Sequence, residues 1–394
     1  FGNEWIEIGK VTILIGNQGS GKSTVAKLVS TFTWLEKSLY KQSSKKRDVT
    51  RKSKFENFYC EYQNLKNYFK PNTEIEFEGT VYSFHYKNGR LSISDIKGNK
   101  FPVPKVMYVP AERNFVSAVS QPEKLKYLPK TLYTFLEEFE RSKQELSEYL
   151  NLPINNLKFN YDREKGESKI IGNDYNLPLY EASSGLQSSI PLYLVSKNLS
   201  ESIDKVGDNS ISKDSLEEMK TLRLRILNIL RNDKITEEIR GQAIELLSSV
   251  TRNDCFINVV EEPEQNLFPT SQWEILKSLL EFNNSKDDNK LIMTTHSPYL
   301  VNFISIAVQA NHLKLKIIDN PKSRNLIKRL NEVVSEKSTI AGENVIVYQL
   351  DETNGTIIKL PNPEGIPSSR NYLNESLRYG NEMFDKLLEI EQEL

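Results

Sequence analysis

Cysteine, histidine and long apolar runs are scarce in this sequence. Cys60 and Cys255 are the only cysteines among 394 residues and show no C-x-x-C spacing, which excludes a disulfide framework and a thiolate metal site and indicates a reducing compartment. The three histidines are His85, His296 and His312, and they form no zinc-ligand pattern. No stretch approaches the roughly 18 apolar residues of a membrane span. We therefore expect a cytoplasmic protein without a membrane partner.

The sequence also has almost no net charge, because its basic and acidic residues nearly balance. The 52 basic and 53 acidic residues give a formal net charge of −1, so no overall attraction to nucleic acid or to a membrane surface is expected. The exception is Lys41–Lys54, which contains seven basic residues and one acidic residue. We interpret this segment as a solvated surface loop, and the alternative is a contact with DNA or an acidic partner. The absence of an initiator methionine suggests that a short strand before Phe1 is missing.

A complete phosphate-binding loop is present at residues 16–24, which are Gly-Asn-Gln-Gly-Ser-Gly-Lys-Ser-Thr. It follows the apolar run Val11–Ile15 and precedes a stretch of helical character over Ser23–Tyr40, the order that a nucleoside triphosphate site requires. The glycines let backbone N–H groups turn toward phosphate, and the helix N-terminus adds partial positive charge. We therefore predict that the chain binds ATP with Mg²⁺. The residues predicted to hold the nucleotide are Asn17, Gln18, Gly19, Ser20, Gly21, Lys22, Ser23 and Thr24.

These side chains are expected to have different roles in binding the nucleotide and in hydrolysis. Lys22 is expected to bridge the β and γ phosphates, and the Ser23 hydroxyl to complete the Mg²⁺ shell. An apolar strand over residues 255–260 ends in Glu261 and Glu262. Glu261 is placed to hold the hydrated Mg²⁺, and Glu262 to polarise the attacking water. The alternative is that the two acids only begin a turn.

Two further strands are expected to deliver polar groups to the same edge of a sheet. The strand Lys290–Thr295 precedes His296, which is placed to contact the γ-phosphate or the attacking water. The strand Lys105–Val109 precedes Glu112 and Arg113, which we also predict to be site residues. The alternative for this pair is a helix N-terminal acid beside a surface arginine.

The length predicts two or three structural units. The expected units are residues 1–113 (first part of the core with an inserted β lobe), 114–253 (a helical lobe) and 254–394 (second part of the core with an α/β tail). Asn88-Gly89 predicts a hairpin inside the alternating run Thr73–Ile96. Other elements expected are strands near 4–8, 12–15, 157–161, 169–179, 344–350 and 355–360, and helices near 56–69 and 371–391.

A fourth motif carries a family resemblance. Ser184-Gly185-Leu186-Gln187 begins an amphipathic helix expected to run to about Lys197, and alone it is only a serine-rich helix cap. Together with the phosphate loop, the acid pair and Thr-His-Ser at 295–297, it resembles the ABC-type ATPase heads of the SMC, RecF and overcoming-lysogenization-defect (OLD) relatives. Glu-Glu-Pro-Glu-x-x-Leu-Phe-Pro over 261–269 is similar to that branch's Asp-Glu-Pro-Glu-x-x-Leu-His-Pro. The resemblance covers residues 5 to about 300.

This resemblance implies an α/β fold, an ABC-type P-loop ATPase head with an antiparallel β lobe, a helical lobe and no long coiled-coil arms. It implies that Ser184 and Gly185 cap the γ-phosphate of ATP bound to a facing subunit, so that ATP joins two heads. It also places Glu112 at the family's Q-loop position, as a metal contact in place of glutamine, and His296 at the switch position. Because Glu112 and Leu186 depart from the pattern, slow hydrolysis is expected.

A stand-alone head without arms resembles the ATPase subunits of bacterial antiphage systems, of the AriA type in PARIS or the PtuA type in Septu. The resemblance implies a homo-oligomer with composite ATP sites that controls a separate effector, a nuclease or toxin, with a phage protein as one conceivable trigger. The tail lacks the spaced acids of a two-metal nuclease. The alternatives are a RecF-type repair ATPase that binds DNA directly and an energiser of a membrane transporter. Phe1 and Trp5 are candidates for stacking on adenine, unless both belong to the core.

Overall fold

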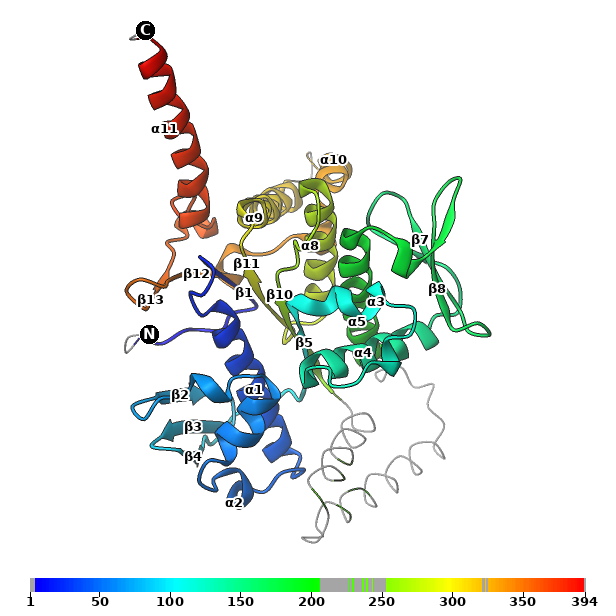
Figure 1. The fold of residues 1–394 in the computed structure, drawn as a ribbon. Helices are drawn as coiled ribbons and strands as arrows, with labels where there is room; N and C mark the ends of the chain where they lie inside the picture. Colours follow the sequence, from blue (N-terminus) through cyan, green and yellow to red (C-terminus); the bar gives the residue numbers. More distant parts are fainter. Residues whose placement is uncertain are drawn as a thin grey trace.

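The computed structural model describes residues 4–205, 253–320 and 325–392, and the single residues 226, 229, 236, 239, 243 and 323. Its centre is a six-stranded sheet in the order β13-β12-β1-β11-β10-β5 (Figure 1). These strands are β1 (Val11–Gly16), β5 (Pro104–Val109), β10 (Cys255–Glu261), β11 (Lys290–Thr295), β12 (Val345–Asp351) and β13 (Thr356–Lys359). Neighbours from β12 to β5 are parallel, and only β13 is antiparallel. The mixed α/β fold class is confirmed.

The two faces of the sheet bury different helices, as the alternation of a strand requires. Val11, Ile13 and Ile15 of β1 belong to the larger core, whereas Leu14 belongs to a second core on the other face. The larger core is closed by α4 (Lys130–Gln144), α5 (Ser184–Lys205), α8 (Pro269–Asn284) and α9 (Pro298–Asp319). The second core is closed by α1 (Lys22–Tyr40), so the helix after the phosphate loop packs directly beneath the sheet.

The predicted β lobe is an antiparallel three-stranded sheet against the second half of α1. Its strands are β2 (Glu74–Glu78), β3 (Tyr82–Lys87) and β4 (Arg90–Asp95). Asn88 and Gly89 have φ angles of 51° and 73°, the two positive values that a tight type I′ hairpin turn needs. The predicted hairpin is confirmed. Phe32 and Leu35 of α1 join the apolar residues of this sheet in a separate core.

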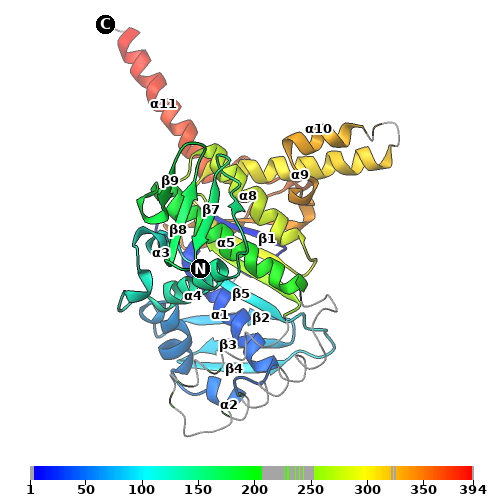
Figure 2. The ribbon, with the colours of Figure 1, turned by 90° about the vertical axis from the view of Figure 1, so that its right-hand side faces the viewer.

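A second antiparallel sheet lies on the α5 side of the molecule (Figure 2). It contains β6 (Leu150–Asn151), β7 (Lys158–Asp162), β8 (Glu167–Ile171) and β9 (Asn176–Pro178). The strand-like stretches expected near 157–161 and 169–179 are therefore paired into one sheet. α3 (Phe115–Ala118) precedes it. The helical character expected for the remainder of the lobe falls largely on residues 206–252, which, apart from five single positions, lie outside the described residues.

Three local expectations differ from the structure. Residues 4–8 form no strand, and the backbone N–H of Glu7 instead donates to the hydroxyl of Tyr348 at 2.8 Å. The basic segment is not a plain loop, because it contains α2 (Lys46–Val49), in which Val49 is fully buried. After it, the helix expected near 56–69 is divided into a π-helical turn, Phe55–Cys60, and a 3-10 turn, Lys66–Tyr68.

The tail completes the central sheet rather than forming a separate layer. β12 pairs with β1 over Val11 to Gly16, because parallel pairing depends on position in space and not on order in the chain. α10 (Leu326–Val333) packs on the end of α9, and α11 (Tyr372–Gln392) extends away from the body without a buried residue (Figures 1 and 2). The 3-10 turns not yet named are Ala111–Asn114, Pro122–Lys124, Leu179–Glu181, Glu336–Ser338, Gly342–Asn344 and Pro363–Gly365.

Helices in the described part of the chain are short. The longest, α5 and α9, have 22 residues each, so no long coiled-coil arm occurs there. None of the helices that the structure describes combines the length and the apolar character needed to cross a membrane.

Candidate functional site

The loop after β1 has the backbone that phosphate binding needs. Gly16, Gly19 and Gly21 all have positive φ angles, of 148°, 79° and 91°. A Cβ on Gly16 would lie 2.4 Å from the carbonyl oxygen of Leu350 and 2.8 Å from Ser20 Oγ, so only glycine fits there. Gly21 is the N-cap of α1. The backbone N–H groups at this helix start are therefore available to an anion.

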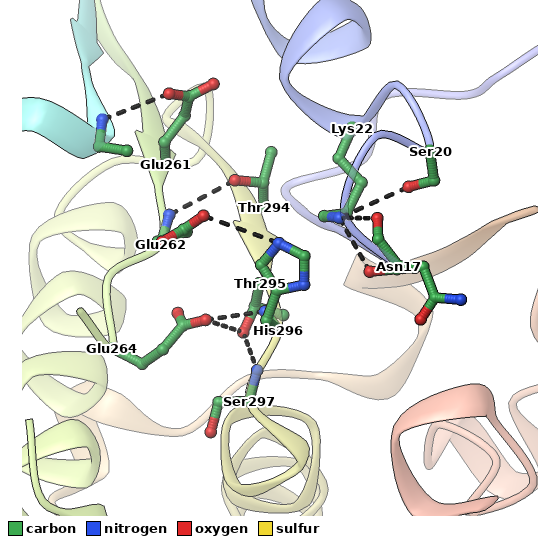
Figure 3. A network of polar contacts seen from close by, with 12 residues as sticks. Asn17, Ser20, Lys22, Glu261, Glu262, Glu264, Thr294, Thr295, His296 and Ser297 are labelled. Carbon is green, nitrogen blue, oxygen red and sulfur yellow. Dashed lines mark hydrogen bonds and ion pairs between the residues drawn. The ribbon is translucent and has the colours of Figure 1, made fainter. Parts of the chain in front are cut away.

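Lys22 lies across the loop with its ammonium group buried (Figure 3). Its Nζ donates to the carbonyl oxygens of Gly16 and Asn17, each at 2.8 Å, and to Ser20 Oγ at 3.4 Å. Burial lowers the pKa of Lys22 to about 8, against the opposing effect of nearby carboxylates, of which Glu262 is the strongest. The loop carbonyl oxygens accept hydrogen bonds from this buried ammonium group but carry no full negative charge. A bound phosphate would supply that charge.

Glu261 stands at the end of β10 and fits a cation ligand. Its Oε2 accepts a hydrogen bond from the N–H of Ala111 at 3.3 Å, whereas its Oε1 is buried and has no hydrogen-bond partner within the described part of the chain. A buried carboxylate oxygen without a partner is costly unless a cation or water satisfies it. Mg²⁺ in such a site would be held by Glu261 and the exposed Ser23, together with oxygens of the bound triphosphate.

Glu262 and His296 face Lys22 from the ends of β10 and β11 (Figure 3). Glu262 has a φ angle of 44°, a left-handed conformation that is uncommon outside glycine, and its N–H donates to the carbonyl oxygen of Thr294 at 3.0 Å. Its Oε1 lies 3.7 Å from His296 Nε2. Burial and the charge of Lys22 lower the pKa of His296. The imidazole is therefore neutral at pH 7 and able to accept a proton.

Two residues of this network were not predicted. Glu264 Oε1 accepts from Thr295 Oγ1 at 2.7 Å and from the N–H of His296 at 2.8 Å, so it orients the histidine backbone. The Glu-Pro-Glu spacing was the only signal for it. Glu352, from the turn after β12, accepts from Asn17 Nδ2 at 2.6 Å, and no local pattern marks a residue so far along the chain.

Ser184 and Gly185 lie away from the phosphate loop. They begin α5, which packs against α3, α4, α8 and β10, whereas the loop follows β1, with β11 between β1 and β10 (Figure 1). The backbone of Gly185 is close to the loop after β10, since a Cβ there would lie 2.6 Å from the carbonyl oxygen of Asn266. The structure thus brings together the phosphate loop, the acid pair and His296, and it places Gly185 against the loop that follows the acid pair.

Arg113 is not the surface arginine of the alternative interpretation, because it is buried beside the acid pair. Its side chain is fully buried and donates to the carbonyl oxygens of Glu261 and Glu262, each at 2.6 Å. The neighbouring Glu112 is exposed in the 3-10 turn after β5, and its predicted metal contact stays a prediction.

The remaining candidates are placed as follows. Gln18 and Asn17 are exposed, Ser20 is buried and Thr24 is half-buried. Trp5 is 62% exposed, so it is not a core residue, and Phe1 lies outside the described residues. Within the described residues, three potential metal ligands lie within 4.8 Å of one another on the β lobe, Glu74, Glu76 and His85, but Glu74 is already paired with Lys87.

Comparison with protein families agrees with the ordered motifs. Residues 117–301 match the model of the AAA ATPase domain family. The match supports an ABC-type ATPase. The matched stretch contains Ser184, the acid pair and His296 but begins after the phosphate loop, so the loop is a separate indication of ATP binding and hydrolysis. No curated protein matches the chain.

Proposed function

We propose that this chain is a slow Mg²⁺-dependent ATPase whose complete site forms between two copies of the chain around ATP. The observation that carries the proposal is the division of the site within one subunit. Lys22, Glu262 and His296 converge on one region (Figure 3), while Ser184 and Gly185 start α5, which packs on β10, two strands from β1 in the sheet. In a dimer with twofold symmetry, each phosphate loop would face the signature pair of the other subunit. Two complete ATP sites would then form.

The residues suggest how hydrolysis proceeds. Lys22 and the loop N–H groups would hold the β and γ phosphates, and Glu261 with Ser23 would hold Mg²⁺, which neutralises charge on the phosphates. The Glu262 carboxylate would orient water opposite the leaving group and accept its proton. The neutral His296, fixed through its backbone by Glu264, would contact the γ-phosphate or this water.

The site assignment is tested by two substitutions and one control. Glu262→Gln should lower kcat by about 100-fold or more and accumulate ATP-bound oligomers, because binding is kept while hydrolysis is lost. Lys22→Ala should lose ATP binding. Glu274→Gln, on α8 and ion-paired with Lys277 away from the site, should leave both unchanged. Phosphate release and light scattering after gel filtration, with and without MgATP, give the readouts. Normal hydrolysis in both variants would overturn the assignment.

We further propose, from the family resemblance, that ATP-dependent assembly controls a separate effector, a nuclease or toxin, in bacterial antiphage defence. The arm-less head and the lack of a two-metal nuclease pattern in the tail favour a partner that supplies the effector chemistry. Copurification of the product of the neighbouring gene with the Glu262→Gln variant in ATP, and not with Lys22→Ala, would support this role. Equal capture by both variants would contradict ATP control.

The alternative is a repair ATPase of RecF type that binds DNA. The observation in its favour is the exposure of Lys45, Arg47, Arg51 and Lys52 around α2. Duplex DNA binding that weakens steeply with salt, and that disappears when these four residues and Lys46 are neutralised, would favour repair over effector control. Lys46 and Arg51 already pair with Asp95 and Asp48, which reduces the free positive charge.

A further inference from the structure

Arg113 is the largest fully buried side chain in the described part of the molecule, and its contacts lie at the proposed site. The guanidinium donates to four carbonyl oxygens, those of Glu261 at 2.6 Å, Glu262 at 2.6 Å, Ser188 at 3.2 Å and Pro110 at 3.3 Å. Burial lowers its pKa to about 10, against the attraction of nearby carboxylates, so it remains a cation at neutral pH. A buried cation is tolerated only where such partners surround it.

The first consequence concerns the backbone of Glu262. A left-handed φ of 44° at a non-glycine residue is strained and persists only where neighbouring contacts hold it. The N–H of Glu262 donates to Thr294 of β11, and its carbonyl oxygen accepts from Arg113. Both sides of the strained residue are thereby fixed. The direction in which the Glu262 carboxylate points toward Lys22 depends on this pair of contacts.

The second consequence concerns α5. The Ser188 carbonyl that Arg113 contacts lies one turn after Ser184 and Gly185. Pro191 within α5 has no N–H, so the carbonyl oxygen of Gln187 loses its normal helical donor, and Ser117 Oγ donates to it instead. The first turns of α5 are therefore bonded to the segment that follows β5.

A second link runs from α5 to the loop after β10. Ser188 Oγ donates to Gln265 Oε1 at 3.0 Å, and Gly185 lies against the Asn266 carbonyl oxygen. The N-terminal end of α5 is thus connected to the Glu262 segment both through Arg113 and through Gln265.

We infer that Arg113 is a positioning residue that joins the catalytic end of β10 to the signature helix, so that the two half-sites of one subunit move as one unit. The inference rests on the proposed function, in which α5 serves the ATP of the facing subunit. Arg113 then transmits the state of Glu262 at one ATP to the helix that caps the other. Hydrolysis at the two sites of a dimer is coupled through each subunit.

The direct test is Arg113→Lys, with Arg141→Lys on the surface of α4 as the matched control. Lysine keeps the charge but cannot reach four carbonyls in a planar fork. We expect kcat to fall about tenfold or more. The Kd for ATP should stay nearly unchanged, because Arg113 is fully buried and contacts the end of β10 and the first turns of α5 rather than the phosphate loop. Equal kcat, or a loss of ATP affinity as large as the loss of kcat, would overturn the positioning role. Thermal unfolding verifies the fold.

The coupling is tested in mixed dimers purified with two tags. One copy carries Glu262→Gln, so that only the partner's site hydrolyses ATP. Adding Arg113→Lys to this inactive copy should slow the remaining site about threefold or more, because α5 of that copy serves it. An unchanged rate would overturn the coupling. Where Arg113→Lys does not fold, Ser188→Ala, which removes one hydroxyl from the second link, is tested in the same mixed dimer with the same criterion.

The outcomes separate this inference from the proposed function. If the Glu262→Gln homodimer does not accumulate with ATP, the proposal of a composite ATP site between two subunits is overturned. The proposed coupling through Arg113 is then overturned as well. If that dimer accumulates and the mixed dimers are unaffected by Arg113→Lys and Ser188→Ala, the composite site stands and only the coupling is overturned.

Discussion

At the scale of single residues, the site depends on backbone conformations that few residues adopt. Glycine supplies them in the phosphate loop, where Gly16 and Gly21 have φ angles of 148° and 91° at no steric cost. Glu262 and Asn266 adopt φ angles of 44° and 58°, and the proposed function requires a carboxylate at the first of these positions. Strain of about 1–3 kcal/mol per residue is typical of functional sites, and the contacts of Arg113 and Thr294 offset it here.

Gly185 offers a residue-scale prediction with an internal control. A Cβ at Gly185 would lie 2.6 Å from the carbonyl oxygen of Asn266, whereas one at Gly380 in α11 would meet nothing within 4 Å. Gly185→Ala should lower the free energy of unfolding by about 1–3 kcal/mol and also slow hydrolysis, because α5 is pushed from the loop. Gly380→Ala should cause no loss, since alanine favours a helix by about 1 kcal/mol. Denaturant unfolding measures both, and equal effects would contradict the packing argument.

At the scale of elements, α1 connects the phosphate loop to the β lobe. Lys22 at its start faces the site, while Phe32 and Leu35 belong to the core of the lobe. Glu36 closes the connection, because its Oε1 accepts from the N–H groups of Val81 at 2.7 Å and Tyr82 at 3.2 Å. The β lobe is therefore attached to the same helix that begins at the phosphate loop.

Substitution of Glu36 tests this connection. Glu36→Ala should lower the free energy of unfolding by about 2 kcal/mol because two N–H groups lose their acceptor, whereas Glu36→Gln keeps an amide oxygen and should lose less. Burial raises the pKa of Glu36, so the folded protein binds a proton more readily than the unfolded chain. Wild-type stability should therefore increase relative to Glu36→Gln as the pH falls through that raised pKa toward the ordinary pKa of a glutamate carboxyl group. Denaturant unfolding at several pH values measures this, and the opposite slope would refute it.

At the scale of the whole molecule, the central sheet unites segments that are far apart in the chain. β1 lies between β11 and β12, and β10 lies beside β5. The carboxyl ends of these parallel strands meet at one edge, which is where open α/β sheets place their ligands. α11 contributes little to this arrangement, since none of its residues is buried.

Removal of residues 375–394 tests that separation. We expect the midpoint of thermal unfolding and the ATPase rate to stay close to those of the full chain, because no buried contact is lost. The deletion begins after Asn371 and Leu373, which are buried or packed on the core. A large loss of stability, measured by calorimetry at several protein concentrations, would indicate that α11 packs against a second copy.

Much of the site was predictable because its signals are local. The glycines and Lys22 lie within seven consecutive residues, 16–22, and Glu262 and His296 each come directly after a strand. The hairpin at Asn88-Gly89 was equally local. Residues 4–8 were misassigned because an alternating pattern cannot show whether a neighbouring strand is in place to pair with it.

Most of the elements and the types of reactive side chain could be predicted from the sequence, because strand and helix periodicity and the presence of lysine, carboxylate and imidazole are local properties of the chain. Three contacts could be found only in the folded molecule: those of Arg113 with buried carbonyl oxygens, of Glu264 with the backbone of His296, and of Glu352 with Asn17. Burial and hydrogen bonding between distant segments depend on how the sheet is assembled, and no local pattern carries that information. The same assembly separates Ser184 from Lys22, so the phosphate loop forms one half of a site for which we propose a second subunit as the other half.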